Sequence, residues 1–162
     1  MAFSTPDICD DFLADLQVLE PLFSEYGDSE QFSGEVVPIK CFEDNTLLKQ
    51  TLGTDGSGKV MVVDGGGSLR RALLGDILAA MAVDNGWQGV VINGCVRDVE
   101  ILKTIRLGVR ALNCYPVRSD KRNEGQLNVP VAFAGANIKP GQYLYADENG
   151  LVVANSRLEL LT

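Results

Sequence analysis

The order of a buried strand, a helix and a second buried strand in the middle of the chain limits the accessible folds most strongly. The apolar run in GKVMVVDGGG, residues 58–67, is typical of a buried strand that ends in a glycine cluster. Residues 73–85 read as a helix that ends before Gly86, and GVVIN, residues 89–93, reads as a second buried strand. This order indicates an α/β fold in which the helix packs against the strands.

The flanking segments extend this pattern along the chain. STPDICDDFLADLQVL, residues 4–19, predicts a first helix with its N-cap at Ser4 or Thr5. Its apolar residues recur at helical spacing: Ile8, Phe12, Leu16 and Leu19. Strands are expected over 34–42 and 108–117, short helices over 43–52 and 97–105, and a hairpin tip at ENG, residues 148–150. No repeat or linker interrupts residues 1–162, which predicts one mixed α/β domain.

The residue types that are missing restrict the chemistry. The chain has no histidine, which excludes a Ser-His-Asp triad, a Cys-His dyad and zinc bound by imidazole. Its four cysteines form no C-x-x-C pair, so buried free thiols are expected instead of disulfides or zinc ligands. Catalysis would have to use carboxylates, Arg, Lys, Tyr, backbone amides or a metal held by oxygen. Oxygen ligands favour a hard divalent cation, Mg²⁺ or Mn²⁺.

The distribution of charge along the chain indicates which binding partners and which cellular location to expect. The net charge of −8 arises almost wholly in residues 1–50, which hold eleven acidic residues against Lys40 and Lys49. Such a chain repels phosphates, which disfavours direct binding of nucleic acid. The acidic first third is interpreted as a solvated face, with a docking surface for a basic partner as the alternative. With no membrane-spanning apolar run and no basic start of a signal peptide, a cytoplasmic protein is expected.

The ends of the central helix–strand pair are expected to meet. A helix over Gly75–Asn85 rises about 15 Å at 1.5 Å per residue, and a strand over 89–93 covers about 16 Å at 3.3 Å per residue. If the two pack antiparallel, Arg97 and Asp98 come back beside Gly75 and Asp76. The lengths therefore predict a corner where charged side chains from both segments lie together.

This corner would suit a small 2-oxo acid. The start of the helix offers an anion site through the backbone N–H groups of Gly75, Asp76, Ile77 and Leu78. Arg97 would add a planar cation for a carboxylate or an enolate. Asp76 and Asp98 could together hold one divalent cation. The alternative is that Asp76 only caps its helix and that Arg97 and Asp98 form a surface pair.

Several segments resemble the RraA-like family, named for the regulator of ribonuclease activity A and including class II 4-hydroxy-4-methyl-2-oxoglutarate aldolases. The most specific is VMVVDGGGSLRRALLGDILAAMAVDNGWQGVVINGCVRDVE, residues 60–100, and YPVRS and GQYLYADENGLVV also match. The resemblance covers nearly the whole chain. It implies a compact α/β fold with β/β/α layering, similar to a swivelling domain, and a ring-shaped homotrimer.

The resemblance also implies roles for the corner. Catalytic members carry an aspartate, twenty intervening residues and then Arg-Asp, which Asp76 and Arg97-Asp98 match without a gap. By this likeness the amides of Gly75 to Leu78 bind substrate, and Arg97 binds its carboxylate or keto group. Asp98 would bind the metal, and Asp76 would orient a metal-bound water. The implied reaction cleaves 4-hydroxy-4-methyl-2-oxoglutarate to two pyruvates, with oxaloacetate decarboxylation as a secondary activity.

Two departures leave a second function open. The regulator branch of the family inhibits an RNA-degrading endonuclease by binding it, and some such members lose the aspartate after the arginine. This chain keeps that aspartate as Asp98, which favours catalysis. Longer aldolases have a C-terminal extension that brings an acidic residue across the subunit interface, a role that Glu159 does not clearly fill. Some members carry an acid where this chain has Ile101, so Glu100 is not assigned. The methyltransferase label once given to the family is set aside, because no nucleotide-binding loop is present.

Overall fold

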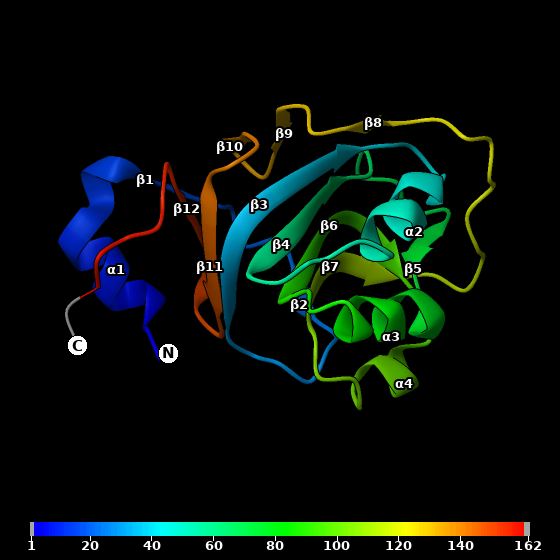
Figure 1. Ribbon diagram of the computed structural model, residues 1–162, viewed down its shortest axis with the longest axis horizontal. Helices are drawn as coiled ribbons and strands as arrows, with labels where there is room; N and C mark the ends of the chain where they lie inside the picture. Colours follow the sequence, from blue (N-terminus) through cyan, green and yellow to red (C-terminus); the bar gives the residue numbers. More distant parts are fainter. Residues whose placement is uncertain (1, 161–162) are drawn as a thin grey trace.

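A mixed sheet of ten strands forms the centre of the computed structural model, which describes residues 2–160 (Figure 1). Its strands are β1 (Leu16–Val18), β2 (Ser24–Glu25), β3 (Phe32–Lys40), β4 (Lys59–Asp64), β5 (Ala72–Leu74), β6 (Gly89–Val96), β7 (Gly108–Cys114), β8 (Gln126–Leu127), β11 (Tyr143–Asp147) and β12 (Gly150–Ala154). The main path runs β1-β12-β11-β3-β4-β6-β7-β2, with β5 beside β6 and β8 beside β3. A separate hairpin joins β9 (Val131–Phe133) to β10 (Ala136–Ile138).

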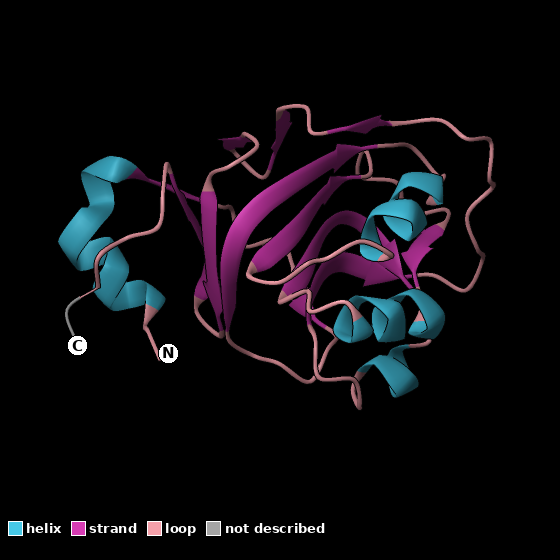
Figure 2. Cartoon of the chain, viewed as in Figure 1, coloured by secondary structure: helices cyan, strands magenta, loops and turns pink. Residues whose placement is uncertain are grey.

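The helices are α1 (Thr5–Phe12), a 3-10 turn (Leu13–Asp15), α2 (Thr46–Leu52), α3 (Asp76–Asp84) and α4 (Val99–Leu102). Strands β3, β4, β6 and β7 are parallel neighbours. Figure 2 shows α2, α3 and α4 gathered at this parallel part of the sheet, whereas α1 lies apart beside the antiparallel part. Within the described residues, no helix is long and apolar enough to cross a membrane.

The two faces of the parallel strands enter different cores. Met61 and Val63 of β4 pack with residues of α2 and α3, and Val60 and Val62 of the same strand pack with β9, β10 and β11. Because both faces are covered, β4 and β6 are apolar along almost their whole length, as parallel strands usually are. The result is an α/β fold with a helical layer, the central sheet and a further β layer, as predicted.

The structure corrects the predicted first helix. The α-helix ends at Phe12, and after one 3-10 turn Leu16 begins strand β1, which pairs antiparallel with β12. The apolar spacing of Leu16 and Leu19 therefore reflects a strand and a loop that pack on the β12 side. Pairing with a strand about 140 residues away outweighs the local helical pattern, which no window of the sequence can reveal.

The central helix also begins later than predicted. Leu73 and Leu74 belong to β5, which pairs parallel with β6, and the helix begins at Asp76. The strand predicted over 89–93 continues to Val96, because β5 and β7 extend its hydrogen-bonded neighbours. The hairpin tip is confirmed, since Asp147 of β11 pairs with Gly150 of β12. All four cysteines are free, but only Cys41 and Cys95 are buried, and Cys114 is exposed.

Helix α1 is fastened to the antiparallel end of the sheet. Ile8 is buried against Tyr145 of β11 and Val152 of β12. The Asp147 carboxylate accepts hydrogen bonds from the Thr5 N–H group at 2.7 Å and the Thr5 hydroxyl at 2.6 Å. The start of the helix is thereby tied to the end of β11.

Candidate active site

The predicted corner forms where β5 and β6 end and α3 begins. The Arg97 N–H group donates to the Leu74 carbonyl at 2.9 Å, which continues the pairing of β5 with β6 by one residue. The next residue, Asp98, accepts a hydrogen bond from the Asp76 N–H group through Oδ2 at 3.0 Å. The expectation that the two segments meet is therefore confirmed, although the roles given to their side chains remain predictions.

Asp98 has an unusual backbone conformation. Its φ of +58° and ψ of +39° place it in the left-handed region, which costs energy for residues with a Cβ and is tolerated best by Asn and Asp among them. This conformation ends β6, starts α4 and directs the carboxylate to the first turn of α3. Within the described residues only Oδ2 of this carboxylate receives a hydrogen bond, so Oδ1 is available to a ligand.

Gly75 is required by the close approach of Asp98. A Cβ at residue 75 would lie 2.5 Å from Oδ2 of Asp98, closer than a carbon atom and an oxygen atom can pack. The glycine is not needed for its φ of −133°, which any residue can adopt. Its missing side chain therefore makes room for the carboxylate at the helix start.

The first turn of α3 offers fewer free amides than predicted. The Asp76 N–H group is bonded to Asp98, and the Ile77 N–H group donates to Oδ1 of Asp76 at 2.9 Å. Of the four amides named from the sequence, those of Gly75 and Leu78 make no hydrogen bond within residues 2–160. The capping alternative does not hold for Asp76, because the N-cap of α3 is Gly75, which has no side chain to cap the helix. The Asp76 carboxylate bonds only the amide of the next residue, and its Oδ2 has no partner in the described part of the chain.

Arg97 is held at the corner by the loop that follows β7. Its Nη1 donates to the Pro116 carbonyl at 3.4 Å, and its stem runs beside Gly75, with Cγ 3.5 Å from the position that a Cβ there would occupy. The residue is half-buried. The side chain of Arg97 is therefore held along its stem, and its guanidinium keeps further N–H donors for a planar acidic group.

All six residues predicted from the sequence line one cavity of about 720 Å³: Gly75, Asp76, Ile77, Leu78, Arg97 and Asp98. The rest of the lining was not assigned to the site from the sequence and comprises Asn45, Lys49, Arg71, Ala72, Leu73, Leu74, Val117, Arg118, Ser119, Asp120 and Lys121. The lining carries five basic residues against three acidic ones, in a chain whose net charge is −8. This local reversal of charge would favour an anionic ligand.

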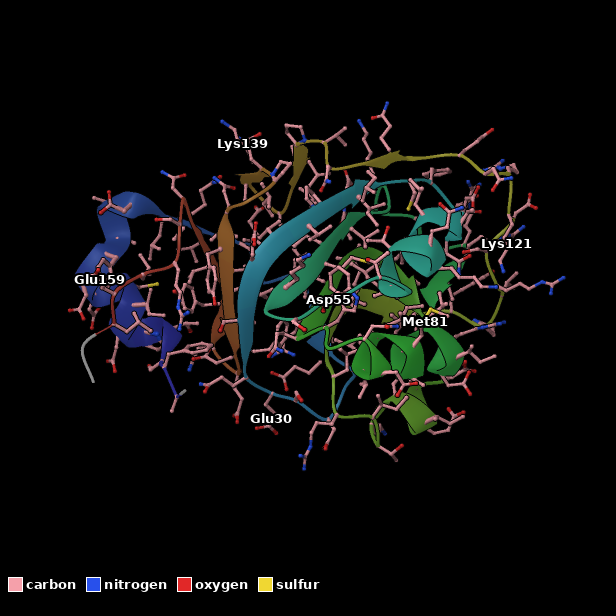
Figure 3. The ribbon with its side chains drawn as sticks, viewed as in Figure 1. Glu30, Asp55, Met81, Lys121, Lys139 and Glu159 are labelled. Atoms are coloured by element: carbon pink, nitrogen blue, oxygen red, sulfur yellow. The ribbon has the colours of Figure 1, made fainter. Side chains whose placement is uncertain are left out.

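One signal in the sequence points to the missed residues. The run YPVRSDKR, residues 115–122, follows β7, and β7 is the parallel neighbour of β6. The loops that follow parallel neighbours emerge at the same edge of a sheet, where α/β proteins place their ligands. Figure 3 shows Lys121 of this loop at the same end of the molecule as Met81 of α3.

The two acidic residues left unassigned lie outside the cavity lining. Glu159 is exposed and lies at the opposite end of the molecule, beside α1 (Figure 3). Glu100 is exposed on α4. Neither residue can therefore be given a role in the cavity of its own subunit.

The donor set fits a hard divalent cation bound in an open site. Asp76 and Asp98 each have one carboxylate oxygen in a hydrogen bond and one available. No group of three metal-ligating side chains exists in the described part of the chain, so a closed protein cage is not formed. Mg²⁺ is commonly held by one or two carboxylates, with water and substrate completing its coordination. Asp76 and Asp98 meet that requirement, because each keeps one carboxylate oxygen without a hydrogen bond in residues 2–160 and both line a basic cavity.

The fold and cavity define a class of α/β proteins with a basic cavity at the carboxyl ends of parallel strands. The RraA-like family model, described as Aldolase/RraA, matches residues 5–153, and the chain belongs to this family.

Relatives and solved structures resemble the chain over nearly its full length. A protein of Stutzerimonas stutzeri (strain A1501), named "Putative 4-hydroxy-4-methyl-2-oxoglutarate aldolase", is 56% identical over 99% of both chains. A Pseudomonas putida (strain GB-1) protein of the same name is 57% identical over 98% of this chain and 97% of its own.

Two solved structures have the same fold but carry other names. One, from Geobacillus kaustophilus HTA426, is called S-adenosylmethionine:2-dimethylmenaquinone methyltransferase. It is 46% identical, with a TM-score of 0.95 and coverage of 96% of this chain and 97% of its own. The other is the RNA-processing inhibitor RraA from Thermus thermophilis, which is 40% identical, with a TM-score of 0.95 and coverage of 98% and 96%.

Proposed function

We propose that the protein is a divalent-metal-dependent aldolase that cleaves 4-hydroxy-4-methyl-2-oxoglutarate into two molecules of pyruvate. The observation that carries the proposal is the meeting of Arg97, Asp98 and the first turn of α3 on one basic cavity. The names of the relatives from Stutzerimonas and Pseudomonas support the same reaction.

The substrate has two carboxylates and a 2-oxo group, and the cavity offers matching partners. The free amides of Gly75 and Leu78, with the positive end of the α3 dipole, suit the carboxylate beside the keto group. The Arg97 guanidinium suits the keto oxygen, where negative charge develops during cleavage. Asp98, with Asp76 beside it, would hold the cation.

Cleavage begins with loss of the proton on the C4 hydroxyl. Asp76 would orient the water that takes this proton, using the carboxylate oxygen not bonded to Ile77. The C3–C4 bond then breaks, C4 becomes the keto carbon of one pyruvate, and the electron pair passes into the enolate of the other. Arg97 stabilises the enolate oxygen, and protonation at C3 completes the second pyruvate. A bound Mg²⁺ or Mn²⁺ would supply Lewis acidity at the 2-oxo group.

Oxaloacetate should be a second substrate. Loss of carbon dioxide from oxaloacetate leaves its electron pair in the same pyruvate enolate, so the groups that stabilise one reaction stabilise the other. This side activity requires no further catalytic residue.

Pyruvate release tests the proposal. Purified protein should release pyruvate from both substrates with Mg²⁺ or Mn²⁺, lose the activity with a chelator and regain it with added metal. Asp98→Ala should lower the rate by roughly a thousandfold, in line with the loss of a group that holds charge at a reacting centre. Asp84→Ala, an exposed change at the far end of α3, is the matched control. Background release by the wild type, or equal release by both variants, would contradict the proposal.

A second candidate function is inhibition of an RNA-degrading endonuclease by direct binding. It is favoured by the likeness to the Thermus inhibitor and by the acidic first third of the chain, which would attract a basic partner segment. The purified endonuclease of the same cell should then be captured at low salt and released at high salt. If the protein does not capture the endonuclease at low salt, this second function is excluded. If it captures the endonuclease and also releases pyruvate, the protein has both functions.

The assembly and location in this proposal follow the family resemblance. We expect a ring-shaped homotrimer in the cytoplasm. Sedimentation equilibrium checks the assembly, because a mass of one or two chains would contradict it. Cell fractionation checks the location.

A further inference from the structure

The loop between β7 and β8, residues 115–125, supplies much of the basic side of the cavity. It carries five consecutive lining residues, Val117 to Lys121. Apart from a single bridge from Arg118 to Ala72, it contains no helix or strand. In Figure 1 it passes around the edge of the molecule beside α2. Its position must therefore come from contacts with other segments.

One buried carboxylate makes the main contact. Asp44 is fully buried, and its Oδ2 accepts hydrogen bonds from the Arg122 N–H group at 2.8 Å and the Glu124 N–H group at 3.0 Å. Its Oδ1 accepts from the N–H group and the hydroxyl of Thr46 at 2.9 and 2.6 Å. A single side chain thus joins the loop to the first residue of α2.

This junction fixes two lining cations relative to each other. Lys49 lies on α2, which begins at Thr46, and Lys121 is the residue before Arg122 in the loop. Both lysines line the cavity, and both also border a smaller adjacent cavity. Their two segments share the Asp44 carboxylate.

Two further bonds hold the loop upstream of Lys121. The Asp120 N–H group donates to the Glu43 carbonyl at 2.9 Å, and the Ser119 hydroxyl donates to the Ala72 carbonyl at 2.9 Å. These bonds do not involve Asp44. Loss of the Asp44 contacts should therefore loosen the loop from about Lys121 onward without releasing it from the sheet.

We propose that Asp44 is a positioning residue that sets the Lys49–Lys121 side of the cavity and thereby determines affinity for the second carboxylate of the substrate. The inference rests on the proposed function. In the proposed reaction the keto-acid half of the substrate is served by Arg97, Asp98 and the first turn of α3, and within residues 2–160 none of these is hydrogen-bonded to the Asp44 side chain. A substrate with two carboxylates depends on both sides of the cavity, whereas pyruvate depends on the α3 corner alone.

The chain contains a matched control. Asp55 makes the same local contacts as Asp44, because its Oδ1 accepts from the N–H group and the hydroxyl of Ser57, two residues on, at 3.0 and 2.7 Å. Asp55 is exposed, receives no bond from the β7–β8 loop and does not line the cavity. Figure 3 labels Asp55 together with Lys121. Asp55→Asn thus changes the same chemistry without the contact to the loop.

Asp44→Asn separates the two halves of the substrate. An amide has one acceptor oxygen and one NH2 group, so the NH2 group must face either the two loop amides or the Thr46 amide, donor against donor. The negative charge that strengthens every one of these bonds is also removed, so the contact to the loop is weakened or lost. We expect KM for 4-hydroxy-4-methyl-2-oxoglutarate to rise about tenfold, the usual scale for one charge-assisted hydrogen bond. Exchange of the pyruvate methyl protons with deuterated water, followed by NMR, passes through the same enolate and should change less than twofold. Asp55→Asn should leave both measurements unchanged.

Amide hydrogen exchange provides a readout independent of activity. The amides of Arg122 and Glu124 should exchange slowly in the wild type and in Asp55→Asn, and rapidly in Asp44→Asn. If Asp44→Asn does not fold, Arg122→Pro replaces it. This change removes the N–H group at residue 122 and the side-chain bond from Arg122 to the Phe42 carbonyl, and it leaves the buried carboxylate intact. The expected rise in KM is the same, and rapid amide exchange is then expected at Glu124 alone.

The outcomes are distinct. Equal loss of cleavage and proton exchange, or an unchanged KM, overturns the positioning role. Slow exchange at residues 122 and 124 in Asp44→Asn overturns the contact itself. If the wild type neither releases pyruvate nor catalyses exchange of the pyruvate methyl protons, the proposed function fails, and the role of Asp44 in affinity fails with it. Amide exchange at residues 122 and 124 still decides whether Asp44 holds the loop.

Discussion

Asp147 at the end of β11 and Asp98 after β6 both accept a backbone N–H group at the start of a helix, but at opposite ends of the molecule. Asp147 is buried and accepts from the N–H group and hydroxyl of Thr5 and from the N–H group of Asn149. Asp98 is half-buried, accepts one N–H group and has a left-handed backbone. The first carboxylate has hydrogen bonds on both oxygens, whereas the second has one oxygen without a hydrogen-bond partner in residues 2–160 and belongs to a residue with a costly backbone conformation.

The difference suggests a way to separate structural from functional carboxylates in this fold. A carboxylate with three or four internal donors, such as Asp147 or Asp44, holds segments together. A carboxylate with one donor on a basic cavity, such as Asp98 or Asp76, keeps an oxygen that could bind the proposed substrate or metal. Changes at the α3 end should therefore affect activity, and changes at the α1 end should affect stability.

The largest effect should come from Arg97→Ala at the α3 end. Loss of the cation that stabilises the enolate should lower kcat for pyruvate release by roughly a thousandfold, within the range found for transition-state donors. The midpoint of thermal unfolding should change little, because the Arg97 side chain makes one long hydrogen bond, to Pro116. Arg106→Ala, an exposed change outside the cavity, is the control. Comparable activity in Arg97→Ala and Arg106→Ala would contradict the assignment of activity to the α3 end.

The opposite pattern is expected for Asp147→Ala. This change leaves the N–H groups of Thr5 and Asn149 without their acceptor and removes the hydrogen bonds between α1 and β11, so it should lower the free energy of unfolding by about 3 kcal/mol. Denaturant titration measures this loss, and pyruvate release at low denaturant should stay within twofold of the wild type. An inactive but stable variant would show that the α1 end contributes to the site.

The next largest effect should be a loss of stability at low pH, caused by protonation of Asp44. Burial raises the pKa of Asp44, but hydrogen bonds from Thr46, Glu124 and Arg122 outweigh burial and lower it to about 2 from an ordinary value of 3.8. Because the folded pKa is the lower one, the stabilisation is complete above pH 4 and is lost as pH falls through 2, with a size of about 2 kcal/mol. Stability curves between pH 5 and 2 should therefore be flatter for Asp44→Asn than for Asp55→Asn. Parallel curves would contradict the role of the buried charge.

The smallest effect is expected for Gly75→Ala. The new methyl group would lie 2.5 Å from Oδ2 of Asp98 and must push that carboxylate away from the helix start. Catalysis should fall about tenfold, since small displacements of positioned groups are costly. Gly53→Ala, where the nearest atom would be 3.4 Å away, is the control. If Gly75→Ala keeps full activity, the position of Asp98 is less constrained than its contacts indicate.

The part of the site that the sequence predicted is the part built by neighbours along the chain. Helix α3 and strand β6 are consecutive, so their lengths alone place Asp98 beside Gly75. Lys49 and Lys121 come from segments more than 70 residues apart in the sequence, and their approach depends on the path of the β7–β8 loop. The role of Asp44 could not be predicted for the same reason, since its loop partners lie 78 and 80 residues away in the sequence.

The same distinction explains the errors in the fold. Local sequence patterns correctly gave β4, from its apolar run, the capped start of α1, from Ser4, and the β11–β12 hairpin tip, from ENG. They failed at Leu16 and Leu73, where a strand partner distant in sequence decides the conformation. They also overstated the free amides of α3, because the return of Asp98 to the helix start was foreseen but not the hydrogen bond that it makes.

The left-handed backbone at Asp98 has a consequence for how this protein tolerates change. Asn and Gly fit that backbone as well as or better than Asp, so a variant library selected only for folding should be rich in both. The same library selected for pyruvate release should retain Asp alone. Residue 98 would then be the position where selection for folding and selection for turnover disagree most strongly.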